Sequence, residues 1–146
     1  MIAIRRAVPG DLATLLELHH AFCDADGHPF DEDRARAGFS PLLDDDRRGV
    51  VWIVDVPPAY AVLTWGWSIE AGGAEAVLDE IFTSERGVGI GSQLVDHVVA
   101  DGEQRGLARV FLETERRNDR VRGWYERHGF RADDSIWMSH DYVDLS

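Results

Sequence analysis

Three strand-like runs follow one another closely in the middle of this chain of 146 residues. Residues 50–56 and 60–69 are rich in β-branched and aromatic side chains, and Gly72 and Gly73 then turn the chain into a third run over residues 76–83. Connections this short join antiparallel neighbours, because a parallel pair needs a crossover of roughly a dozen residues or more. The centre of the fold is therefore predicted to be an antiparallel sheet.

Helical patterns flank these strands on both sides in the sequence. Apolar residues at i, i+3, i+4 and i+7 spacing predict a helix that begins near Pro9 and ends near Gly27, and Asp31 is expected to cap a second helix. Further helices are predicted over residues 91–105 and 118–128, and further strands over residues 2–6, 109–115 and 130–142, the last as a hairpin or a pair of strands. We expect one mixed α/β domain of the α+β type over residues 1–146, with a mostly antiparallel sheet of about six to seven strands flanked by four helices.

Composition excludes several kinds of site. Hydrophobic residues make up 45% of the chain, which indicates a globular protein with its own core. Cys23 is the only cysteine, so neither an internal disulfide nor a zinc site of several cysteines can form. The six histidines show no H-E-x-x-H spacing, and we expect no metal. His19 lies on the apolar face of the first predicted helix, and we interpret it as a packed residue.

The charge pattern is equally selective. All 15 basic residues are arginines, so a phosphate loop of the GxxxxGK[ST] type and a Schiff-base lysine are both impossible. The net charge of −12 argues against binding to nucleic acid. Residues 1–85 hold 16 acids and 6 arginines (net −10), whereas residues 86–131 hold 9 arginines and 7 acids (net +2). No signal peptide or membrane span is visible, and a cytoplasmic location is expected.

A glycine-rich run lies between the third strand of the antiparallel set and the helix that follows it. Its sequence is Arg86-Gly87-Val88-Gly89-Ile90-Gly91-Ser92. Alternating glycines at a helix N-terminus leave backbone N–H groups free for an anion, and an arginine adds a bidentate phosphate donor. Ser92 stands where a dinucleotide fold needs its last glycine. The run predicts a phosphate or pyrophosphate cradle, and the alternative is a glycine turn without a ligand.

The same run resembles the acyl-CoA loop of the GCN5-related N-acetyltransferase (GNAT) superfamily, whose pattern is R/Q-x-x-G-x-G/A. Arg86, Gly89 and Gly91 match that pattern. A second segment is similar to the N-x-x-A-x-x-x-Y-x-x-x-G-F segment of the family, and it matches at Asn118, Tyr125, Gly129 and Phe130. The strand before the loop resembles that of the small polyamine-type branch.

The resemblance implies a reaction. An amine attacks acetyl-CoA directly, a carboxylate takes the proton of the amine, and a tyrosine protonates the leaving thiolate. Glu80 is our candidate for the base, although Asp79 also fits, and Tyr125 is the candidate acid. The residues implied in binding acetyl-CoA are Ile81, Phe82, Thr83, Arg86, Gly87, Val88, Gly89, Ile90, Gly91, Ser92 and Asn118.

One departure from the family pattern concerns the turn before the loop. The usual spacing is V-x-P-x-x-R, but Thr83 to Arg86 spans two residues fewer and lacks the proline. Holding the usual spacing would place Leu78 at the acidic position in place of Glu80. A non-catalytic module that binds or senses acyl-CoA, N-acetylation of a protein or peptide, and a structural domain with an empty glycine turn therefore remain as alternatives. The preferred acceptor is a small cationic amine, and family habit suggests a homodimer. The lack of a long apolar run predicts no membrane partner.

Overall fold

The computed structural model describes residues 2–145, which divide into two compact units. One unit ends at Glu113 and the other begins at Thr114. The first carries the sheet and most of the helices, and the expectation of one domain over the whole chain stays a prediction.

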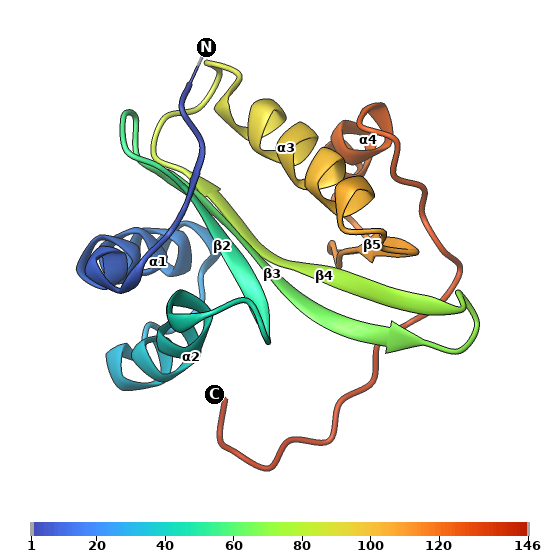
Figure 1. Ribbon diagram of the computed structural model, residues 1–146, viewed down its shortest axis with the longest axis horizontal. Coiled ribbons are helices and arrows are strands. Elements are labelled where there is room, and N and C mark those ends of the chain that lie inside the picture. The colour runs from blue at the N-terminus through green and yellow to red at the C-terminus, as the bar shows by residue number, and fades with distance from the viewer. Residues whose placement is uncertain (1, 146) are drawn as a thin grey trace. The chain divides into compact units, whose positions relative to one another are not determined.

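The first unit is built on a sheet of five strands in the order β1-β2-β3-β4-β5 (Figure 1). The first four strands are antiparallel neighbours, and β5 is parallel to β4. The strands are β1 (Arg5–Arg6), β2 (Gly49–Val54), β3 (Ala59–Ser68), β4 (Gly73–Thr83) and β5 (Arg109–Phe111). The predicted antiparallel centre is confirmed, while β1 and β5 are shorter than expected.

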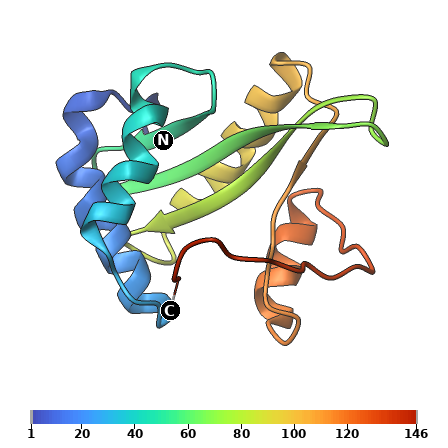
Figure 2. The same cartoon turned by 90° about the horizontal axis from the view of Figure 1, so that it is seen from below.

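Helices cover both faces of this sheet. On one face lie the short helix η1 (Pro9–Asp11), α1 (Leu12–Asp26) and α2 (Glu32–Asp44), and on the other lies α3 (Ile90–Gln104), as Figures 1 and 2 show. Local sequence signals determine where α1 ends and where α2 begins. Gly27 ends α1 in the left-handed region at φ 72°, and the Asp31 side chain accepts the N–H of Arg34 at 3.0 Å to cap α2.

Two layers of apolar side chains fill the space between the sheet and its helices. The layer under α1 and α2 includes Leu15, Phe39, Leu43, Tyr60 and Val62. On the opposite face, α3 buries Leu94, Val95 and Val98. Both layers follow from the helical stripes and from the alternation of side chains along the strands.

An irregularity in β4 changes which face its residues use. Val62 of β3 pairs with Glu80, but the next residue, Leu63, pairs with Leu78, so Asp79 is an extra residue in a β-bulge. Val62 belongs to the layer under α1 and α2, and Leu63 therefore faces α3. The pairing places Glu80 on the α1 and α2 face and Leu78 on the α3 face.

The other edge of β4 is paired over only part of its length. β5 pairs with Glu75, Ala76 and Val77 and then ends. No strand in the described part of the chain pairs with residues 78–83 on that side. Since alternate residues of β4 direct their N–H and C=O groups away from β3, this segment presents backbone hydrogen-bonding groups along an unpaired edge.

The second unit contains α4 (Asp119–Arg127) and an irregular segment after it. The Asn118 side chain accepts the N–H of Val121 at 3.2 Å and caps the helix. The predicted hairpin over residues 130–142 is wrong, because the described chain forms no strand there. Its apolar side chains stay largely exposed, as Ile136 at 72% and Met138 at 87% illustrate. The sheet therefore has five strands instead of six or seven.

Within residues 2–145 no helix combines the length and the apolar character that a membrane crossing requires.

Candidate active site

The glycine loop adopts the geometry that the sequence predicts for an anion site. Gly87 and Gly89 have φ of 78° and 79°, and Gly89 is the residue that begins α3. A Cβ atom built at either position would meet no protein atom within 4 Å. The glycines are therefore required by the left-handed backbone and not by crowding, and the space in front of the loop is open for a ligand.

The charges around this loop favour a negative ligand. The N-terminal turn of α3 carries no acidic residue, and its unsatisfied N–H groups form the positive end of the helix dipole. Arg86 is exposed and makes no ion pair with the described residues. A phosphate or pyrophosphate group matches this combination of backbone donors and guanidinium.

Glu80 lies at the centre of a hydrogen-bonded group on the opposite side of β4 from Leu78. Its Oε1 atom accepts the Tyr60 hydroxyl at 2.7 Å and lies 2.8 Å from Nδ1 of His19. On the other side of the same imidazole, Nε2 lies 3.5 Å from Sγ of Cys23. The group joins α1, β3 and β4, and the exposed fractions of the His19 and Glu80 side chains are 17% and 21%.

Burial controls the protonation of the neighbours of Glu80. Burial raises the pKa of the Tyr60 hydroxyl well above its ordinary value, and the Glu80 carboxylate raises it further. The pKa of the Cys23 thiol is raised for the same two reasons. Part of Asp79 reaches solvent, yet desolvation of its carboxyl raises its pKa, with a smaller contribution from Glu80. Tyr60 and Cys23 therefore carry their protons at neutral pH and act as donors.

Aromatic rings surround the His19 imidazole. Phe22, Phe30 and Phe39 have ring centroids 5.8–6.1 Å from it. His19 is thus packed, as its place on the apolar helix face predicts, but it also contacts a carboxylate. An apolar wall of three rings therefore lies beside the Glu80 carboxylate.

The remaining residues implied in acetyl-CoA binding fall into two groups. Ile81 and Thr83 lie on the unpaired edge of β4. Phe82 lies between them, where it pairs with Tyr60 of β3 and packs its ring against Phe22 and Tyr60. Together with residues 86–92, they form one continuous stretch of the first unit. Asn118 and Tyr125 belong to the second unit.

Tyr125 lies on the buried side of α4. Its ring contacts Trp124 at 4.8 Å and Phe130 at 5.7 Å between centroids, and its residue is 9% exposed. Burial raises the pKa of Tyr125 to about 12. The phenol therefore keeps its proton at neutral pH.

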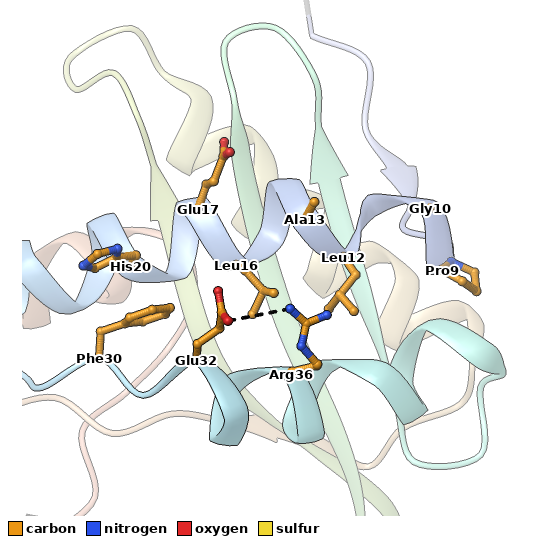
Figure 3. Close-up of a pocket in the computed structure, with 10 residues that line it drawn as sticks. All are labelled: Pro9, Gly10, Leu12, Ala13, Leu16, Glu17, His20, Phe30, Glu32 and Arg36. Atoms are coloured by element: carbon orange, nitrogen blue, oxygen red, sulfur yellow. Dashed lines mark ion pairs between the residues drawn. The ribbon is translucent and has the colours of Figure 1, made fainter.

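A groove of about 520 Å³ between α1 and α2 is separate from the Glu80 group (Figure 3). His20 stacks on Phe30 at 4.2 Å along it, and Glu32 pairs with Arg36 at 3.9 Å. Its lining contains neither Glu80 nor a residue of the glycine loop; it consists of Pro9, Gly10, Leu12, Ala13, Leu16, Glu17, His20, Phe30, Glu32 and Arg36. Among residues 2–145 no group of three or more His, Cys, Asp or Glu side chains is arranged to hold a metal ion.

Comparison with known proteins decides the family. The sequence model of the acetyltransferase (GNAT) family matches residues 14–130, which include the glycine loop, Glu80 and Tyr125. The chain belongs to the GNAT family. Within this family the resemblance to the polyamine-type branch stays a prediction.

Solved structures share the fold of this GNAT protein over almost its whole length. An integron cassette protein from the mobile metagenome of Cole Harbour Salt Marsh is 27% identical with a TM-score of 0.84, and the match covers 97% of this chain and 91% of that one. A protein from Arthrobacter sp. FB24 is 28% identical with a TM-score of 0.79, covering 99% and 97%. An aminoglycoside N-acetyltransferase in complex with CoA is 19% identical with a TM-score of 0.77, covering 98% and 96%, and shows the fold alone. No curated protein sequence matches the chain.

The sequence missed Tyr60, His19 and Cys23 as members of the Glu80 group. Tyr60 stands in a strand pattern where an aromatic residue is ordinary, and His19 stands on an apolar helix face. Nothing in the spacing connects either residue with Glu80. The one available signal is a polar ring among apolar neighbours, which indicates that a buried partner is needed.

Proposed function

We propose that this protein transfers the acetyl group of acetyl-CoA to the amine of a small cationic acceptor. The observation that carries the proposal is the left-handed glycine loop at the N-terminus of α3, in a chain of the GNAT family. Residues 86–92 would hold the pyrophosphate, and the unpaired edge at residues 81–83 would receive the amide groups of the pantetheine arm. Asn118 joins this set by family resemblance.

The reaction moves protons away from the amine and onto the departing thiolate. Glu80 accepts, directly or through water, the proton that the ammonium group loses before it attacks. The nitrogen then forms a bond to the carbonyl carbon of the thioester, the carbon–sulfur bond breaks, and the second proton of the nitrogen leaves to water as the amide forms. Tyr125 donates a proton to the departing thiolate. The products are the acetylated amine and the free thiol of CoA, and exchange with water restores both side chains.

The properties of the two proposed groups support these roles. The pKa of about 12 keeps the Tyr125 hydroxyl protonated, as a general acid requires. A carboxylate is required because an amine with a pKa near about 10 is mostly protonated at neutral pH. Glu80 is partly exposed, and both of its contacts use the same oxygen atom, Oε1.

Charge supports a cationic acceptor. The first 85 residues carry a net charge of −10 and include both helices beside Glu80, whereas residues 86–131 carry +2. Salt screens exposed charges beyond about 8 Å, so this is a steering effect and not a binding pocket in itself. If only neutral or anionic acceptors were acetylated, this part of the proposal would be wrong.

Calorimetric titration with acetyl-CoA tests the cofactor first. We expect saturable binding by the wild type and loss of binding in Gly89→Asp, which places a carboxylate at the mouth of the loop. Gly38→Asp is the matched control, because it adds the same charge to the exposed face of α2. Release of the CoA thiol is then measured across a panel of amines that differ in charge.

One observation favours a second function. The turn from Thr83 to Arg86 is two residues shorter than the family pattern, which could leave acyl-CoA bound without turnover. This non-catalytic alternative predicts binding in the calorimeter and no thiol release with any amine. N-acetylation of a protein or peptide is distinguished by including basic peptides in the same panel.

A further inference from the structure

The hydrogen bonds around Glu80 define where each proton lies. The ionised carboxylate has no proton to give, so the contact with His19 at 2.8 Å requires Nδ1–H to donate to Oε1. In a neutral imidazole, Nε2 then carries no proton. In that state the Cys23 thiol, whose pKa is raised by burial, donates to Nε2 at 3.5 Å.

Two donors therefore converge on one oxygen of Glu80. Tyr60 approaches Oε1 from β3 at 2.7 Å, and His19 approaches it from α1. Within residues 2–145 Oε2 has no hydrogen-bond or ion-pair partner. The carboxylate is held through one oxygen, and the other is available to a molecule from outside.

From this geometry we infer that His19 is a positioning residue for the base, which fixes Glu80 so that Oε2 meets the proton of the acceptor amine. Cys23 contacts the other ring nitrogen, Nε2, and the rings of Phe22, Phe30 and Phe39 hold the imidazole plane. The inference rests on the proposed function, since it assigns the partner of the proposed base.

The titratable groups that face Glu80 come from three elements. They are His19 and Cys23 of α1, Tyr60 of β3 and Asp79 of β4. Tyr60 and Cys23 hold their protons at neutral pH, so neither of them contributes to the pH profile near neutrality.

Substitution of His19 tests the inference through turnover. His19→Leu fills the aromatic pocket but removes the donor, and we expect kcat to fall by roughly 10- to 100-fold with an unchanged KM for acetyl-CoA. The difference in kcat between His19→Leu and the wild type should become smaller at high pH, because the amine is then deprotonated without a general base. His19→Asn keeps an N–H near the position of Nδ1 and should restore much of the rate. His28→Leu, which removes an exposed imidazole that contacts neither Glu80 nor the three rings, should behave as the wild type.

The outcomes separate this inference from the proposed function. An active wild type whose rate and pH profile His19→Leu leaves unchanged overturns the inference alone. A wild type that acetylates no amine overturns the proposed function and the inference with it. Nitrogen-15 NMR of the imidazoles gives a readout without turnover, for which we expect a proton on Nδ1 of His19. The opposite tautomer would overturn the inference even if His19→Leu were inactive or poorly folded.

Discussion

Leu78 and Glu80 face opposite sides of the sheet, although they are only two residues apart on one strand. An unbroken strand would place them on the same face. The extra residue between them, Asp79, changes the alternation and brings a carboxylate to the face covered by α1 and α2. A bulge of one residue thus decides whether β4 presents an acid or an aliphatic chain beside His19.

Glu80 and Asp79 are the two carboxylates that the sequence offers as the base, and substitution separates them. Glu80→Gln should lower kcat by on the order of 100-fold or more, because the general base is lost while the shape is kept. Asp79→Asn should keep most of the activity, since Asp79 belongs to the bulge and lies outside the His19 and Tyr60 contacts. Steady-state kinetics with acetyl-CoA held at saturation measures both. Equal losses in the two variants would contradict the assignment.

Gly89 should be required for its left-handed backbone conformation. Gly89→Ala places a Cβ at φ 79°, and we expect a loss of about 1–2 kcal/mol in the free energy of unfolding. Gly38 lies within α2 without a positive φ or a neighbour that a Cβ would meet, so Gly38→Ala should instead gain about 0.5–1 kcal/mol. Urea denaturation gives both values, and a neutral effect of Gly89→Ala would show that the loop relaxes.

Tyr125 should not limit the reaction at alkaline pH. Its pKa of about 12 keeps the hydroxyl protonated throughout the usual range of assays. We expect kcat to rise up to a pH of about 10 as the acceptor amine loses its proton, and Tyr125→Phe to lower kcat on the order of 100-fold without weakening acetyl-CoA binding. A fall in kcat centred near a pH of about 9 in the wild type that is absent in Tyr125→Phe would contradict this.

Arg5 and Asp11 form a bidentate ion pair that joins β1 to the start of α1. The contacts are 2.9 and 2.8 Å, and the Arg5 guanidinium holds the pKa of the Asp11 carboxyl below its ordinary value of 3.8. A lowered pKa in the folded state adds stability above pH 3.8, and this stability is lost as the pH falls through the lowered value. Asp11→Asn should therefore destabilise the protein at neutral pH by about 1 kcal/mol, a size limited by the partial exposure of Arg5.

Thermal denaturation across the acid range checks the sign of this effect. The difference between Asp11→Asn and the wild type should shrink below pH 3.8. Asp45→Asn is the control, because Asp45 pairs with Arg47 only two residues away and ties no separate elements together. A difference for Asp11→Asn that is constant with pH would show that the ion pair is not its source.

The parts of the fold set by local chemistry could be predicted from the sequence. Gly27 marks the end of α1 and Asp31 marks the start of α2. The glycines of the loop mark the start of α3. Each of these signals acts within a few residues, through a left-handed φ or a side chain that caps a free N–H.

The parts set by distant contacts could not be predicted. The hairpin expected over residues 130–142 has the composition of strands, but a strand forms only where it finds a partner, and the sequence does not say which edge is free. The apolar pattern of the strand does not indicate the bulge at Asp79. The side of the sheet on which Glu80 lies, and its contact with His19, therefore could not be predicted from the sequence. The glycine loop was found because its chemistry lies in one continuous segment.

The partial pairing of β4 with β5 has a consequence for handling the protein. Residues 78–83 present backbone groups that no strand of the described chain satisfies on that side, and such an edge is a template on which another chain can add a strand. A cosubstrate that lies along this edge takes the place of an intruding strand. The protein without acetyl-CoA should therefore aggregate more readily during storage. Adding the cosubstrate during purification should raise the solubility of the protein.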